Sequence, residues 1–118
     1  MAVNIGPKIG IDGESEFRSQ INNIIQSQRT LQSEMKAVTA EFDDNADSQQ
    51  KLTRQYEILN KQIDKQKQRI SLLDKGLDDC DSKYGEADTK TQKWQQAVHD
   101  ATADLYRMQK ELSVVEST

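Results

Sequence analysis

Apolar residues recur along most of this chain at alternating steps of four and three positions. Starting from Phe17, the frame runs to Val115 without a slip, and nearly all of its positions are apolar. A strict repeat of seven residues is typical of coiled coils, whereas an isolated helix drifts toward a period of about 3.6. The sequence therefore predicts long helices that pack along a common seam. The seam residues are Ile21, Ile24, Leu31, Met35, Val38, Phe42, Leu52, Tyr56, Leu59, Ile63, Ile70, Leu73, Leu77, Trp94, Val98, Leu105, Met108 and Leu112.

A few positions of this stripe are polar, and they are not evenly spread. Gln28 and Gln66 stand alone, and isolated polar residues in a seam can fix the register between helices. Asn45 and Gln49 are consecutive in the stripe and belong to an acidic stretch around 43–48. Asp, Asn and Ser bond their own backbone in turns and so compete with the helix. We therefore expect a helix break at this stretch.

Two breaks divide the helical region into three predicted helices. The first is segment 43–48, where Asp47 or Ser48 can cap a new helix. The second is Gly85, because glycine readily adopts the left-handed conformation that ends helices, with Asp88 or Thr89 available as the next cap. The expected fold is all-α, with long coiled-coil helices over about 15–42, 48–84 and 87–116.

The N-terminal residues differ in composition and predict an extended arm. They hold the only proline, Pro7, and three of the five glycines. Ile9 and Ile11 alternate with small or polar residues, which permits a short strand. Ser15 can cap the first helix. The predicted domains are the arm and one helical coiled-coil unit, over 1–14 and 15–118.

Two packings of the helices agree with the unbroken frame. If the breaks are turns, the helices fold back into antiparallel hairpins, and a hairpin about Gly85 sets Leu77 against Trp94. If the breaks stay helical, the segment 17–115 is a rod of roughly 150 Å. The charges beside the stripe do not decide between them, because a surface ion pair contributes less than about 1 kcal/mol.

Composition narrows the classes of function. The chain of 118 residues is 34% hydrophobic, 5% aromatic and 31% charged, which suits a narrow seam rather than a thick core. A net charge of −4 gives no general attraction for nucleic acid or anionic lipid. Apolar runs are too short for a membrane-spanning helix or a signal peptide. Cys80 is the single cysteine, so no internal disulfide can form.

No grouping of residues predicts catalysis, a cofactor or a metal site. Asp43, Asn45 and Asp47 imitate the opening of a calcium loop, but the glycine that such a loop needs next is missing. His99 lies beside the stripe without partner ligands, and Cys80 lies within it as a small packed thiol. The sequence thus indicates a structural protein and not an enzyme.

Four stretches resemble the N-terminal region of phage tail tape measure proteins, of the type found in long-tailed phages and prophages of Gram-positive bacteria. Together they cover nearly the whole chain. Tape measure proteins are usually many hundreds of residues long, so the resemblance implies a part of a longer protein or a truncated product. The stretches are "IGIDGESEFRSQINNI" at 9–24, "SEMKAVTAEFDDNADS" at 33–48, "LNKQIDKQKQRISLL" at 59–73 and "YGEADTKTQKWQQAVHDATADLYRMQKEL" at 84–112.

The resemblance implies a mechanical role in the phage tail. A tape measure protein occupies the lumen of the tail tube, and its length sets how far the tube polymerises. Tail tube subunits, assembly chaperones and tail tip proteins are the implied partners, beside self-association through coiled coils. The implied location is the tail of the virion, and the host cytoplasm before assembly. The alternative is a bacterial coiled-coil scaffold or regulatory interaction protein unrelated to tails.

Overall fold

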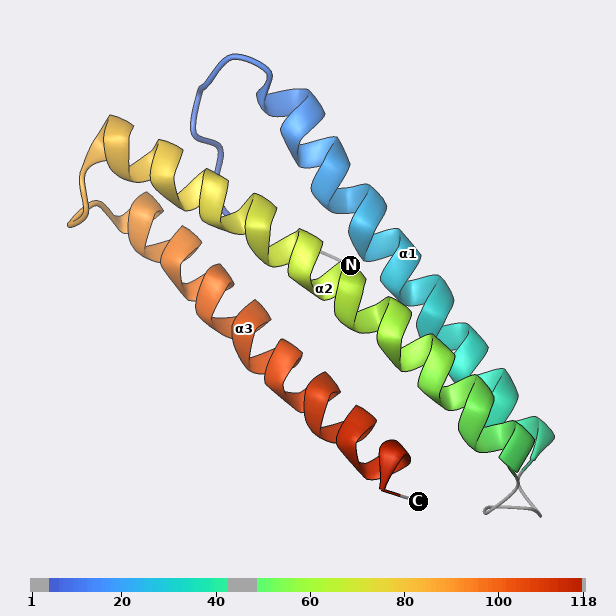
Figure 1. Cartoon of the computed structure of the whole chain (residues 1–118). Coiled ribbons are helices and arrows are strands. Elements are labelled where there is room, and N and C mark those ends of the chain that lie inside the picture. Colours follow the sequence, from blue (N-terminus) through green and yellow to red (C-terminus); the bar gives the residue numbers. More distant parts are fainter. Residues whose placement is uncertain (1–4, 43–48, 118) are drawn as a thin grey trace.

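Three long helices make up most of the structure, a computed structural model that describes residues 5–42 and 49–117 (Figure 1). The prediction of an all-α fold with three helices is confirmed, and the helix limits lie close to the predicted ones. The break predicted at 43–48, with its caps Asp47 or Ser48, lies outside the described residues. The helices are α1 at Glu14–Glu41, α2 at Gln49–Tyr84 and α3 at Thr89–Glu116.

The central helix of the bundle is α2, and its neighbours run antiparallel to it (Figure 1). It packs against both α1 and α3, whereas α1 and α3 make no close backbone approach to each other within the described residues. The molecule measures 53 × 24 × 20 Å. The chain therefore folds into hairpins, and the straight rod of roughly 150 Å is not its arrangement.

The turn between α2 and α3 is built on Gly85. Its φ of 89° lies in the left-handed region, and its N–H donates to the carbonyl of Asp81 at 2.8 Å. Asp88 then caps α3, because its carboxylate accepts the backbone N–H of Lys90 at 2.8 Å. The predicted break at Gly85 is confirmed, and of the two proposed caps it is Asp88, not Thr89, that serves.

The start of α1 differs from the prediction. The helix begins at Glu14 and its N-cap is Gly13, with a φ of 74°, so Ser15 lies inside the helix and the cap predicted there was wrong. The positive φ of Gly13 turns the chain from the arm into the helix. The short strand predicted around Ile9 and Ile11 is absent from the described arm, 5–13, whose backbone bonds to side chains of the helices instead.

The apolar core forms two clusters along the bundle. We call them the arm-end cluster, near the turn at Gly85, and the far-end cluster, near the end of α1. The arm-end cluster draws on the arm and all three helices, whereas the far-end cluster draws only on α1, its C-cap and α2. The buried members are Ile5, Ile9, Phe17, Ile21, Ile25, Leu73, Cys80, Trp94, Ala97 and Ala101 in the first, and Leu31, Val38 and Ile58 in the second.

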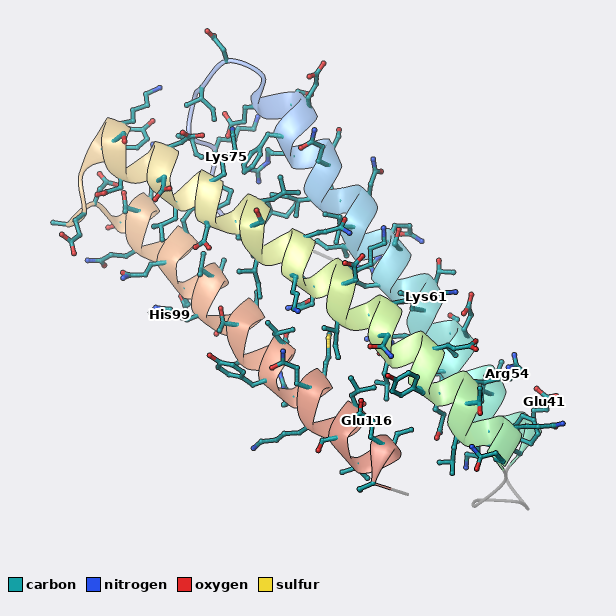
Figure 2. All side chains as sticks on the ribbon, in the orientation of Figure 1. Glu41, Arg54, Lys61, Lys75, His99 and Glu116 are labelled. Atoms are coloured by element: carbon teal, nitrogen blue, oxygen red, sulfur yellow. The ribbon has the colours of Figure 1, made fainter. Side chains whose placement is uncertain are left out.

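An exposed ion pair joins α1 and α2 at the far end. The Arg54 guanidinium lies 2.7 Å from a carboxylate oxygen of Glu41 (Figure 2). Surface pairs of this kind contribute little to stability. The arm-end cluster buries more apolar residues than the far-end cluster, and the ion pair adds little to the far end. The arm end is therefore the more firmly packed half of the bundle.

Leu73 tests the position of the core. Its side chain is 1% exposed in the arm-end cluster. Leu73→Ala is expected to lower the free energy of unfolding by about 2–4 kcal/mol, because the truncation leaves a cavity. Leu52→Ala is the matched control, since Leu52 is a half-buried leucine of the same helix and should cost markedly less. Urea unfolding followed by circular dichroism measures both; equal costs would contradict this core.

Candidate functional site

The arm folds back along the bundle at the arm end (Figure 1), where its side chains join the arm-end cluster. Its Ile5 and Ile9 side chains are only 7% and 0% exposed and belong to the arm-end cluster. We call this site the arm groove. It is lined by Phe17 and Arg18 of α1, Gly76, Lys83 and Tyr84 of α2, and Trp94 of α3.

Trp94 is the centre of the arm groove. It is fully buried, and its ring centroid lies 5.9 Å from that of Phe17. A Cβ atom added to Gly6 of the arm would lie 2.7 Å from the Trp94 ring, and one added to Gly76 of α2 would also collide with it. Two glycines therefore let the arm and α2 approach the indole closely. The indole Nε1–H donates to the carbonyl of Pro7 at 3.0 Å, which satisfies its one donor.

Three more side chains of the groove donate to backbone carbonyls of the arm. Arg18 of α1 donates to the carbonyl of Gly6 at 2.8 Å. Tyr84 of α2 donates to the carbonyl of Ile9 at 2.9 Å, and Lys83 donates at 2.6 Å to the carbonyl of the residue that follows. The groove thus binds the arm through its backbone carbonyls and buries two of its side chains.

Glu14 completes these contacts from the first turn of α1. Its two carboxylate oxygens accept the N–H groups of Ile9 and Gly10 at 2.6 and 2.7 Å. Burial acts to raise the pKa of Glu14, but the backbone donors and nearby Arg18 outweigh it, so the pKa lies below its ordinary value. The carboxylate is therefore charged at neutral pH, and it holds the arm in its turn.

A second polar feature crosses the middle of the bundle. Gln28 of α1 donates to the side chain of Gln66 of α2 at 2.5 Å, and Gln66 donates to the carbonyl of Ala101 in α3 at 2.6 Å. Arg69 of α2 donates to the amide oxygen of Gln28 at 3.2 Å. We call this set the glutamine relay. Both glutamines are buried, and the amide oxygen and nitrogen of each are hydrogen-bonded within the relay, so the relay holds the three helices in one register.

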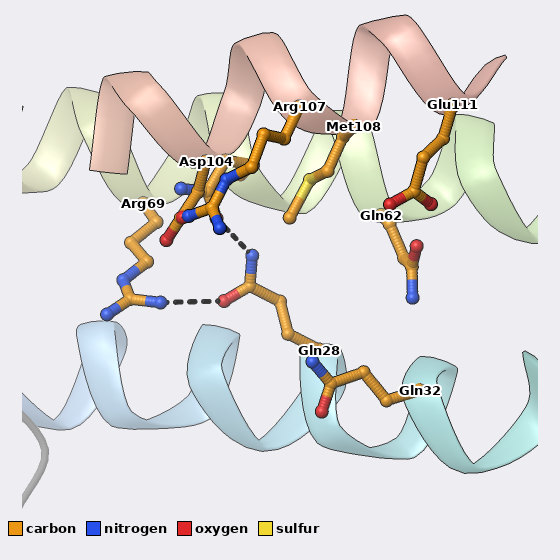
Figure 3. Close-up of a pocket in the computed structure, with 9 residues that line it drawn as sticks. Gln28, Gln32, Gln62, Arg69, Asp104, Arg107, Met108 and Glu111 are labelled. Carbon is orange, nitrogen blue, oxygen red and sulfur yellow. Dashed lines mark hydrogen bonds and ion pairs between the residues drawn. The ribbon is translucent and has the colours of Figure 1, made fainter. Parts of the chain in front are cut away.

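A polar pocket of about 260 Å³ opens beside the relay between the three helices (Figure 3). Arg69 and Arg107 bring positive charge to its wall, and Asp104 and Glu111 bring negative charge. Burial lowers the pKa of Arg69, whose guanidinium nevertheless stays charged, and its buried Nε has no hydrogen-bond partner. Because the charges balance, the pocket has no net preference for anions or cations.

The predicted seam residues are buried or half-buried in the structure, except Tyr56. Tyr56 is 42% exposed at the far end of α2. The buried ones are Ile21, Ile24, Leu31, Val38, Leu59, Ile63, Leu73 and Trp94. The half-buried ones are Met35, Phe42, Leu52, Ile70, Leu77, Val98, Leu105, Met108 and Leu112.

Sequence reasoning missed several buried residues beside the stripe. Ile25, Ile58 and Ala97 are buried, as are Ile5 and Ile9 of the arm. A signal for two of them exists, because Ile25 and Ile58 each adjoin a seam residue and widen the stripe to a second face. In the arm, the alternation of Ile9 and Ile11 predicted a strand, and it gave no sign that Ile5 and Ile9 would both enter the helical core.

The remaining candidate residues that the structure describes are His99 and Cys80. His99 lies exposed on α3 and points away from the bundle (Figure 2). Cys80 is buried, and the Thr91 hydroxyl lies 3.6 Å from its sulfur. In the part of the chain that the structure describes, no three His, Cys, Asp or Glu residues gather as metal ligands, and no helix is long and apolar enough to span a membrane. The calcium-like stretch 43–47 lies outside that part.

Comparison of the chain with protein families, curated proteins and solved structures finds no match. The resemblance to tape measure proteins therefore rests on the four sequence stretches that carry it. The two features that the fold brings together are the arm groove and the glutamine relay.

Attachment of the arm is expected to depend on pH through Glu14. Because the folded pKa is lowered, the stability that Glu14 contributes is present above the pKa of unfolded glutamate and is lost as pH falls through the folded value. Trp94, the only tryptophan, reports the attachment by its fluorescence. Glu14→Gln should remove the acid-induced change in emission, whereas Glu16→Gln, at an exposed position of the same turn, should keep it. Identical acid profiles for all three chains would refute this role.

The glutamine relay predicts strong coupling between its two amides. Gln66→Leu alone should lower the free energy of unfolding by about 1–3 kcal/mol, because it leaves the buried Gln28 amide without its acceptor. Gln28→Leu combined with Gln66→Leu should lose less than the sum of the two single changes, because neither amide is then left unpaired. A double-mutant cycle by urea unfolding measures this. Additive losses would mean that the two side chains do not interact.

Proposed function

We propose that this chain is a coiled-coil segment of a phage tail tape measure protein, which lies in the tail tube lumen and helps to set tail length. The proposal rests first on the resemblance, whose four stretches run from 9 to 112. It gives the chain a structural role and no catalytic one. The proposed location is the tail of the virion, and the host cytoplasm before assembly.

The observation that carries the proposal is the lengthwise alignment of all three helices along one narrow body (Figure 1). A length gauge needs a body whose extent follows from its number of residues. Helices meet this need, because each residue adds about 1.5 Å along the axis. The seam residues lie along the full length of the three helices, which supports coiled-coil packing as the way the segment keeps its form.

The segment would differ clearly in length between its folded form and a straight form. Folded, the bundle is 53 Å long. As one straight helix, residues 14–117 would extend about 150 Å at roughly 1.5 Å per residue. The length that the segment contributes to a tail therefore reports which form it takes there.

The proposed partners follow the same resemblance. They are tail tube subunits, tail assembly chaperones, tail tip proteins and further copies of the chain through coiled coils. The balanced charge of the pocket and the net charge of −4 support protein partners over nucleic acid or membrane lipid.

Tail length measured by electron microscopy tests the proposal. We expect a tandem duplication of 14–117, within the protein that carries it, to lengthen tails by about 53 Å if the segment is folded. A straight helix would instead add about 150 Å. The control duplicates only 49–117. Because α2 and α3 are antiparallel, the folded hairpin begins and ends at the same end of the bundle and should add little length, whereas its straight form would add about 100 Å.

Virions that contain the longer protein but keep their tail length would overturn the proposal. Absence of the chain from purified virions would do the same. Either result would favour the alternative, a bacterial coiled-coil scaffold or regulatory protein.

A further inference from the structure

The arm groove holds the arm in the way that a protein holds a bound peptide. Four side chains of the helices donate hydrogen bonds to carbonyls of the arm, Glu14 accepts two of its N–H groups, and two isoleucines enter the core. Only residues 11–13 connect this bound segment to α1. The contacts themselves do not require that the arm and the helices belong to one chain.

The groove also selects a sequence. Gly6 has a φ of 110° and no room for a Cβ against Trp94, so other residues are excluded at this position. Ile5 and Ile9 are both buried, four residues apart. A segment that fits therefore has the form Ile-Gly-x-x-Ile, which this chain's own arm carries at 5–9.

The connection between arm and α1 depends on glycine. Gly10 and Gly13 have φ values of 79° and 74°, and they let the chain reverse onto the bundle. A Cβ at Gly13 would meet no atom within 4 Å, so a substitution there acts through the backbone conformation alone. The conformation of this turn therefore determines whether the arm binds in the groove of its own chain or in that of another chain.

We propose that the arm groove is a docking site for the arm of a second copy of this chain. The arm of a second copy can make the same contacts with the groove as the chain's own arm. The free energy of exchange therefore depends only on the conformation of the turn and on the local concentration of chains. A second copy is the occupant because it carries the segment that fits. Such an exchange would link bundles to one another. The proposal does not depend on whether the chain belongs to a phage tail.

The first experiment supplies the arm as a separate peptide. The full chain with Ile5→Asp and Ile9→Asp keeps every groove side chain, but its own arm cannot enter the core. The probe is the synthetic peptide of residues 5–13, IGPKIGIDG. We expect the peptide to shift Trp94 emission to the blue in a saturable way, while a peptide with Asp in place of both isoleucines does not. No shift at millimolar peptide, in a variant whose helical circular dichroism is intact, would overturn the docking site.

The second experiment tests the copy as occupant and does not depend on how that variant folds. Gly13→Val strains the turn, because a β-branched residue disfavours positive φ, whereas Gly13→Asn tolerates it and is the matched control. We expect light scattering to show twice the chain mass of 13.5 kDa for Gly13→Val, with Trp94 emission unchanged, and a monomer for Gly13→Asn. Adding Ile9→Asp should dissociate the dimer. A Gly13→Val chain that stays monomeric, whatever its emission, would contradict the assignment.

Discussion

The burial of Trp94 is the constraint on which the rest of the fold depends. The indole lies on α3, yet it touches Phe17 of α1, Gly76 of α2 and Gly6 of the arm. Since α1 and α3 make no close backbone approach within the described residues, side-chain contacts such as that between Trp94 and Phe17 join them at the arm end. A large aromatic ring can fill such a junction only if small residues surround it, and the two glycines meet that requirement.

From this junction the packing weakens toward the far end of the bundle. The glutamine relay follows next, where Gln66 reaches both Gln28 and the carbonyl of Ala101. Beyond it, α3 contributes half-buried residues, and the far-end cluster is built by α1 and α2 alone. The bundle therefore has a firmly closed end and a looser end, and local opening is favoured at the looser one.

Much of this architecture follows from the sequence, because the heptad frame and Gly85 define where the helices lie and where α3 begins. The frame assumes one partner per helix, however, and α2 has two, so Ile58 lies buried beside the expected stripe. The hydrogen bond from Gln28 to Gln66 depends on how the hairpins align, which no local pattern encodes. The arm groove could not be predicted from the sequence for the same reason. The need for glycine at 6 and 76 appears only when both residues pack against Trp94 in the folded chain.

The claim that the arm closes the Trp94 junction is tested most directly by hydrogen exchange at the Trp94 indole in the native chain, followed by nuclear magnetic resonance. The indole Nε1–H is bonded to the carbonyl of Pro7 in a fully buried junction. If the arm closes the bundle as described, this proton exchanges nearly as slowly as the backbone amide of Leu73 in the core. Exchange at the rate of a free indole, with the Leu73 amide still protected, would show that the arm does not hold the junction closed.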